Sequence, residues 1–85
     1  FFNVINNGWV SPHTDICDAG KFQNTTLVIL LQKPEKGGNI IYDNKRIIMN
    51  AGDAYILNES TIHGLETVKS KISFRALVLW FKKTL

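Results

Sequence analysis

The sequence lacks what a disulfide needs, because its single cysteine, Cys17, has no second cysteine to pair with. One cysteine in a small chain fits a reducing compartment, so we expect a cytoplasmic protein. Long hydrophobic runs are also missing. The longest, Leu27–Leu31 and Ala76–Phe81, fall far short of the ~20 apolar residues of a membrane-spanning helix. We therefore expect no membrane association through such a helix.

The sequence also lacks a large excess of charge of either sign. Ten basic and seven acidic residues leave a formal net charge of only +3. The basic residues are scattered along the chain instead of gathering into one stripe, as is typical of solvated loops and strand edges. A nucleic-acid partner is therefore not expected, and the pattern leaves the oligomeric state open.

No window repeats apolar residues at the helical spacing for long enough to predict a helix of more than about two turns. Short β-rich runs alternate instead with turn signals such as Asn6–Gly8 and Asp43–Asn44, the second of which predicts a hairpin. The predicted strands cover residues 1–5, 9–12, 25–32, 39–42, 45–49, 54–57, 64–68 and 72–81. The run Thr25–Gln32 is continuously apolar and β-branched, which predicts burial on both faces. One all-β domain over residues 1–85, a sandwich or barrel, is expected.

Three residues are candidate metal ligands. His13 and Asp15 are two positions apart, so in an extended segment both side chains leave the same face of the strand. His63 is the only other histidine and lies in a turn-like segment. Two histidines and one carboxylate with open coordination positions form the facial triad of non-haem Fe(II) oxygenases. The sequence therefore suggests an iron site at His13, Asp15 and His63.

Arg75 is the fourth candidate site residue. It lies between Phe74 and Ala76 in the last predicted strand. A buried arginine needs an anionic partner, because an unpaired buried charge is expensive, and its planar fork suits a carboxylate. We expect Arg75 to face the interior together with Ser73 and Leu77, and to bind an anionic ligand there.

Together these features follow a recognisable order along the chain, with glycines and hydrophobic strands between them. The matching segments are Gly8, His13–Asp15, Thr26–Leu31, Gly37–Ile40, Ala51–Ala54, His63–Leu65, Arg75 and Leu79–Phe81. This pattern resembles the Fe(II)- and 2-oxoglutarate-dependent dioxygenase superfamily, most of all its prolyl-hydroxylase-like group. The resemblance covers nearly the whole chain, from Gly8 to Phe81.

The resemblance implies a double-stranded β-helix, or jelly roll, that is the core of a larger catalytic domain. His13, Asp15 and His63 would be the catalytic iron ligands, and Arg75 would bind the distal carboxylate of the cosubstrate 2-oxoglutarate. The implied activity is hydroxylation of a C–H bond in an unidentified small-molecule or peptide substrate, with release of succinate and CO2.

The chain departs from the family pattern at the second contact to 2-oxoglutarate. Leu77 stands where some relatives have serine, and leucine or isoleucine stands where many have a tyrosine. Thr26, Tyr42 or Tyr55 could supply this contact instead, and the sequence does not choose among them.

Two other classes of protein remain open. A cupin-type metal-binding or sugar-binding protein without oxygenase activity would share the jelly-roll fold. Gly52–His63 has the spacing of a second cupin motif, but a first cupin motif wants two histidines and a downstream glutamate. A non-enzymatic interaction module built on a degenerate jelly roll is the other alternative.

Overall fold

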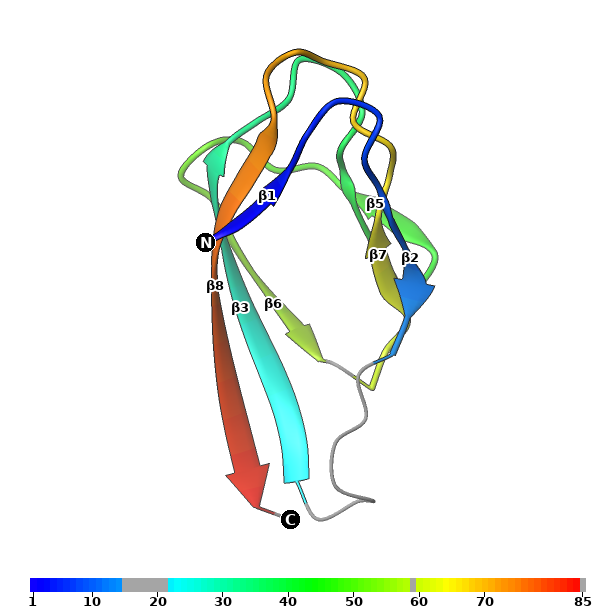
Figure 1. Cartoon of the computed structure of the whole chain (residues 1–85). Coiled ribbons are helices and arrows are strands. Elements are labelled where there is room, and N and C mark those ends of the chain that lie inside the picture. The colour runs from blue at the N-terminus through cyan, green and yellow to red at the C-terminus, as the bar shows by residue number, and fades with distance from the viewer. Residues whose placement is uncertain (15–21, 59, 85) are drawn as a thin grey trace.

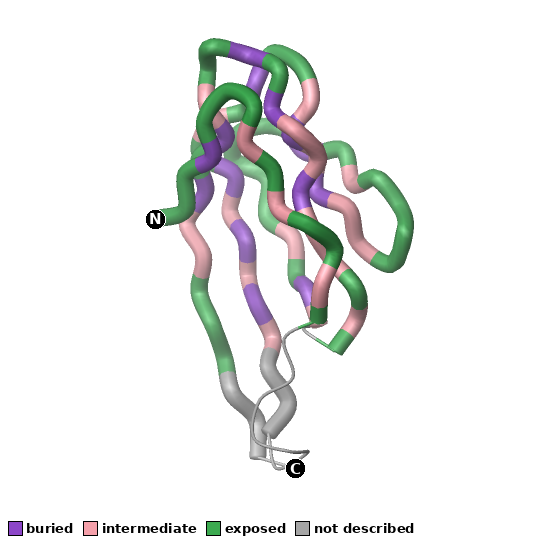
Figure 2. Tube along the Cα trace, turned by 45° about the vertical axis from the view of Figure 1, so that its right-hand side comes forward, coloured by how far each residue is buried: buried purple, intermediate pink, exposed green. Residues whose placement is uncertain are grey.

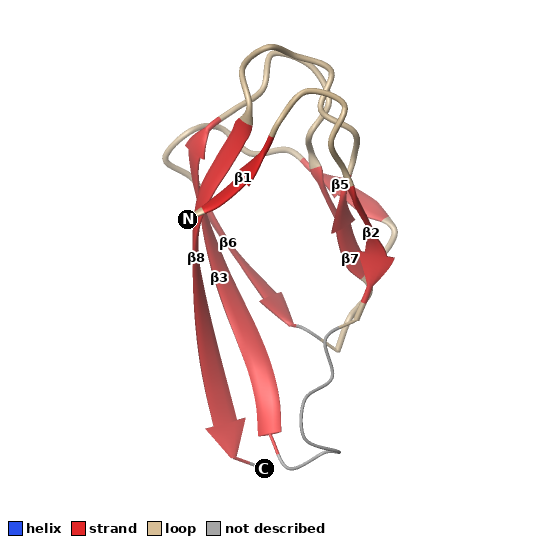
Figure 3. Ribbon diagram, in the orientation of Figure 1, coloured by secondary structure: helices blue, strands red, loops and turns tan. Residues whose placement is uncertain are grey.

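A computed structural model describes residues 1–14, 22–58 and 60–84 of the chain, with residues 22–24 and 82–84 described by their backbone alone. Over this range the chain forms eight strands and no helix. Figure 3 colours the strands red and the loops between them tan. The strands are β1 Phe2–Val4, β2 Val10–His13, β3 Phe22–Gln32, β4 Ile40–Tyr42, β5 Lys45–Ile47, β6 Ala54–Asn58, β7 His63–Leu65 and β8 Phe74–Thr84. The prediction of an all-β chain is confirmed. No helix that could cross a membrane occurs among the described residues.

The strands form two four-stranded sheets that face each other (Figure 1). The strand order is β1-β8-β3-β6 in one sheet and β2-β7-β4-β5 in the other. Every named strand pair is antiparallel. The long strands β3 and β8 pair from Phe22 opposite Thr84 to Gln32 opposite Arg75, and they form the centre of the first sheet.

The core lies between the two sheets. On β3, Thr26, Val28 and Leu30 are buried and alternate with residues that are only half-buried, as Figure 2 shows. This period of two is expected of a strand with one face toward a core. The prediction that this strand is buried on both faces is wrong. The other face of β3 is exposed to solvent at Leu31. On the neighbouring strand β6, Ile56 is exposed on the same side of the sheet.

The turn between β4 and β5 follows directly from two residues. Asp43 and Asn44 have φ values of 52° and 62°, the left-handed conformation that both central residues of a type I′ turn adopt. Asp and Asn tolerate this region better than most residues. Tyr42 and Lys45 therefore pair directly across the hairpin, as the sequence predicted.

A polar cluster ties the start of β4, the strand β5 and the end of β7 together. The Glu66 carboxylate accepts hydrogen bonds from Nδ2 of Asn39 at 2.7 Å and from Nε of Arg46 at 2.9 Å. Partial burial raises the pKa of Glu66, but the hydrogen bonds from Asn39 and Arg46 outweigh this effect. They hold the pKa below its ordinary value of 4.5.

Glu66→Gln should lower the free energy of unfolding by about 1 kcal/mol near pH 7, because the Arg46 side chain is 61% exposed and solvent weakens the pair. A depressed folded-state pKa stabilises the fold above the unfolded-state pKa, and this stabilisation disappears as the pH falls through the folded value. Urea unfolding of wild type and variant should therefore differ near neutral pH and converge in acid. Glu35→Gln, at an exposed carboxylate, is the control. A difference that is constant with pH would contradict this role of Glu66.

Candidate metal centre

The two histidines lie directly opposite each other on neighbouring strands. His13 ends β2, His63 begins β7, and the two residues are register partners. Their ring centroids are 4.6 Å apart and their planes are tilted by 56°. Fifty residues of sequence separate them, yet the rings are close enough to bind one first-row metal ion, whose bonds to histidine nitrogen are about 2.0–2.1 Å.

An irregularity in β2 brings His13 into this position. Val10 pairs with Leu65 and His13 pairs with His63, so β2 uses one residue more than β7 over the same length. The extra residue lies between Val10 and His13, and this stretch contains Pro12, which has no N–H to donate to the ladder and is therefore suited to a bulge. Because of the bulge, both Val10 and His13 line the same cavity. Regular alternation would have placed them on opposite faces.

The two rings are held by the same kind of hydrogen bond, from Nδ1 to the main-chain carbonyl two residues earlier. Nδ1 of His13 lies 2.7 Å from the carbonyl oxygen of Ser11, and Nδ1 of His63 lies 2.8 Å from that of Thr61. A carbonyl only accepts, so each bond requires the proton on Nδ1. A neutral ring with its proton on Nδ1 carries its lone pair on Nε2. Such bonds from the second ring nitrogen are the usual support of metal-binding histidines.

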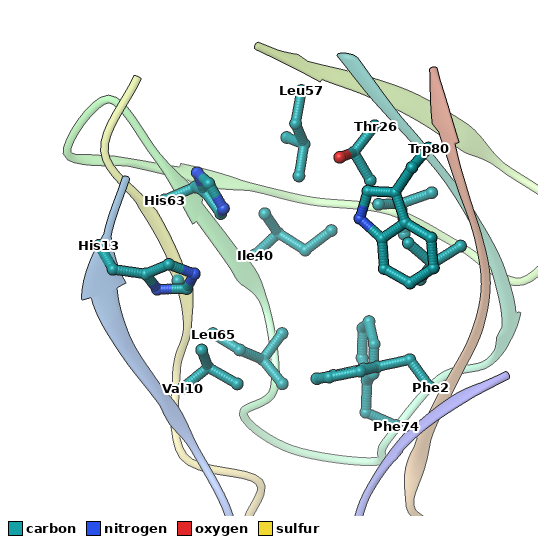
Figure 4. Close-up of a pocket in the computed structure, with 13 residues that line it drawn as sticks. Phe2, Val10, His13, Thr26, Ile40, Leu57, His63, Leu65, Phe74 and Trp80 are labelled. Carbon is teal, nitrogen blue, oxygen red and sulfur yellow. The ribbon is translucent and has the colours of Figure 1, made fainter. Parts of the chain in front are cut away.

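The histidines open onto an apolar cavity of about 200 Å³ between the two sheets. In Figure 4 the rings of His13 and His63 extend into it from one side, while Phe2, Phe74 and Trp80 line the opposite side. Among the described lining residues, polar groups come from the two histidines, the Thr26 hydroxyl and the indole N–H of Trp80. A metal ion at the histidines would therefore lie beside a mainly apolar surface.

The third predicted ligand, Asp15, lies outside the described residues, as does Cys17. Within the described part of the chain no group of three or more histidine, cysteine or acidic side chains could hold a metal ion. Two of the three predicted ligands are thus brought together. The chain continues from His13 through Thr14 toward the third.

Arg75 is not where the sequence predicted. It is exposed, and it alternates along β8 with the buried Phe74 and Ala76. Phe74, Val78 and Trp80 line the cavity, so Arg75 points away from it on the outer face of the sheet. The predicted interior orientation, shared with Ser73 and Leu77, is wrong. Its expected contact with a ligand carboxylate beside the histidines has no geometric support.

Of the three residues considered for a second ligand contact, Thr26 is the one that lines the cavity. It is buried on β3, opposite Trp80 on β8 and Leu57 on β6. Tyr42 instead packs edge-on against Tyr55, with ring centroids 5.7 Å apart, and its hydroxyl accepts a hydrogen bond from the N–H of Asn58.

No protein-family model, curated protein or solved structure matches the chain. The case for a function therefore rests on the residues of the site themselves. Trp80 was not among the residues predicted for the site, yet it lines the cavity and is 69% exposed. Its position relative to Phe74 could have indicated this. The two residues are an even number of positions apart on β8, so in a regular strand their side chains lie on the same face.

Proposed function

We propose that the protein is a non-haem Fe(II) dioxygenase that uses a 2-oxo acid cosubstrate. His13, Asp15 and His63 are the proposed iron ligands. The observation that carries the proposal is the pairing of two distant histidines across β2 and β7 at the edge of an apolar cavity, with Nδ1 of each ring held by a main-chain carbonyl.

The proposed fold is a double-stranded β-helix, the architecture implied by the resemblance. Its support is the strand order, since β2-β7-β4-β5 faces β1-β8-β3-β6 and successive strands mostly alternate between sheets. Eight antiparallel strands in two sheets are what a jelly roll requires. In this arrangement both histidines fall on the shorter-stranded sheet, at the end from which the chain continues toward Asp15.

The donor set fits ferrous iron. Imidazole nitrogens suit iron and carboxylate oxygen completes a facial triad, so Asp15, two residues after His13, is the natural third ligand. Iron with a bound 2-oxo acid would supply the dioxygen chemistry that hydroxylates a C–H bond, with CO2 lost from the oxo acid and succinate formed when that acid is 2-oxoglutarate. The protein would orient the rings through the Ser11 and Thr61 carbonyls and provide a mainly apolar surface beside the metal.

2-Oxoglutarate itself fits less well than iron. Its distal carboxylate needs a cationic partner, and Arg75, the residue expected to provide one, lies on the opposite face of β8. None of the described residues that line the cavity is a lysine or an arginine. A buried carboxylate without a partner is strongly disfavoured.

The outward position of Arg75 also favours a second candidate, a cupin-type protein that binds a metal and a small molecule without oxygenase activity. Both candidates share the histidine pair. Oxygen consumption that depends on iron and on a 2-oxo acid distinguishes them, because only the oxygenase consumes dioxygen and releases CO2 from the acid.

Iron titration of two neighbouring variants tests the proposed ligand set. Asp15→Ala should weaken Fe(II) binding by at least about a hundredfold, since losing a ligand should cost at least as much as losing an outer-shell partner, which typically costs 10- to 100-fold. Cys17→Ala should bind iron like the wild type, because Cys17 has no role in the proposed site. Equal affinities in wild type and Asp15→Ala, measured anaerobically, would refute the proposed triad.

A further inference from the structure

We propose that one end of the molecule is a docking surface for a lipid bilayer that is rich in anionic phospholipid. This surface, the loop end, consists of three loops, residues 5–9, 33–39 and 66–73, which connect β1 to β2, β3 to β4 and β7 to β8. The loops meet at the top of Figure 1, whereas His13 and His63 lie at the other end of β2 and β7. The proposal uses no residue of the proposed metal site and does not depend on it.

Main-chain hydrogen bonds join the three loops into one surface. The N–H of Asn7 donates to the carbonyl of Val68 at 2.8 Å, and the N–H of Val68 donates to the carbonyl of Gly8 at 2.9 Å. The N–H of Lys69 donates to the carbonyl of Lys36, also at 2.9 Å. The backbone segments that carry the exposed side chains of the loop end are therefore held together.

The loop end has an excess of positive charge, although its lysines are scattered along the sequence. The two acidic residues of the loops are Glu35 and Glu66, and the Glu66 carboxylate already binds Arg46 on β5 at 2.8 Å. Just outside the loops, the cation Arg75 and the carboxylate Asp53 cancel in the count of charges. Each lysine close to an anionic leaflet increases the affinity about fivefold. The exposed lysines of the loop end are Lys33, Lys36, Lys69 and Lys71.

Exposed aliphatic side chains lie beside these lysines. Ile5 is 66% exposed and Ile72 is 41% exposed. Val4 pairs with Phe74 at the end of the ladder between β1 and β8, so both isoleucines lie just beyond that pair, on neighbouring loops. An isoleucine gains free energy when it leaves water for the acyl boundary of a bilayer. Lysines beside exposed aliphatic groups therefore match both layers of an anionic membrane surface.

A bilayer fits this combination better than a nucleic acid, the other common partner of lysine-rich surfaces. Isoleucine has no flat face on which a base can stack, and the three loops, all of whose residues are described, contain no arginine to bind a base edge bidentately. Trp9, at the end of the first loop, is exposed and suits either partner, because tryptophan stacks on bases and also concentrates at membrane interfaces. The two isoleucines decide in favour of the bilayer.

Co-sedimentation with vesicles tests the proposal. Partitioning into phosphatidylcholine vesicles with about 30% phosphatidylserine should be at least about tenfold stronger than into phosphatidylcholine alone, and salt should reduce the difference. Equal partitioning into both kinds of vesicle, or into neither, would overturn the proposal. Release of the protein by a DNA duplex at equal phosphate concentration would assign the loop end to a nucleic acid instead.

A pair of charge reversals locates the surface. Lys36→Glu should weaken partitioning into the anionic vesicles by at least about tenfold, because it replaces an attraction with a repulsion. Lys45→Glu makes the same change of charge in the hairpin at the histidine end, where Tyr42 pairs with both Lys45 and His63, and it should partition like the wild type. Equal losses in the two variants would show that net charge, and not the loop end, controls binding.

A pair of isoleucine substitutions tests insertion into the bilayer. Ile72→Ser should weaken partitioning by at least about threefold, since it removes apolar area that leaves water on docking. Ile62→Ser alters an isoleucine of similar exposure, 46%, next to His63, and should match the wild type. An unchanged Ile72→Ser would contradict contact of this loop with the acyl layer. Circular dichroism checks that the variants are folded, and if Lys36→Glu is not, the isoleucine pair locates the surface.

Discussion

His63→Ala is expected to abolish measurable binding of Fe(II) at micromolar protein while leaving the fold intact. Only two histidines exist in the chain, and they face each other at 4.6 Å across β2 and β7. Removing one leaves a single imidazole and, at most, the Asp15 carboxylate, a donor set too small to compete with water for a labile ion. We expect an affinity loss of at least about a hundredfold. Isothermal titration with Fe(II) under nitrogen measures it directly, and His13→Ala should behave in the same way.

Thr61→Ala is the matched control for His63→Ala. It changes a side chain in the same turn but keeps the main-chain carbonyl to which Nδ1 of His63 donates, so iron binding should be preserved. Circular dichroism and urea unfolding of the metal-free proteins would show whether His63→Ala remains folded. A folded His63→Ala protein that binds iron as tightly as the wild type would rule out the histidine pair as the metal site.

Many of the turns and strands are determined by residues close together in the sequence, and they could be predicted for that reason. Turn residues such as Asp43 and Asn44 fix the hairpin between β4 and β5, and each strand is a short β-rich run between such turns. The two histidines and Asp15 could be named because their side-chain chemistry is rare in this chain. Their proximity could be predicted only from the resemblance, since contact between β2 and β7 depends on pairing between distant segments.

It was harder to predict which face of each strand points toward the core, and Arg75 shows why. Both faces of β8 are apolar, with Val78 on the inner face and Leu77 and Leu79 on the outer, so alternation gives no contrast from which to choose. A register shift between Leu30 and Gln32 lies opposite Arg75 and adds a residue to β3 at this level. Bulges of this kind change the parity of a strand without an obvious mark in the sequence.

The same limit applies to β2. Regular alternation from Val10 would direct His13 away from the cavity, and the extra residue between Val10 and His13 corrects this. Proline is a weak signal for a bulge, because it also occurs at strand ends and on edge strands. The site therefore depends on how closely β2 can approach β7, and Gly64 on β7 allows that close approach.

Gly64→Ala should separate the two histidines. A Cβ atom at Gly64 would lie 2.7 Å from the carbonyl oxygen of Val10 and 3.1 Å from the nitrogen of Pro12. Both atoms belong to the backbone of β2, so no side chain can turn aside to make room. The strand β2 must move away from β7, and His13 moves with it. We expect the Fe(II) affinity to fall by at least about tenfold and the free energy of unfolding to fall by about 1–3 kcal/mol, as for other overpacked sites.

Ile62→Ala is the control for this prediction. It alters the exposed residue on the other side of His63 and makes the side chain smaller, so it creates no pressure on β2. Its iron affinity should match that of the wild type. Because Gly64→Ala also lowers stability, both variants should be titrated at a temperature where circular dichroism shows them fully folded. If folded Gly64→Ala bound iron with wild-type affinity, the spacing between β2 and β7 would not limit the site.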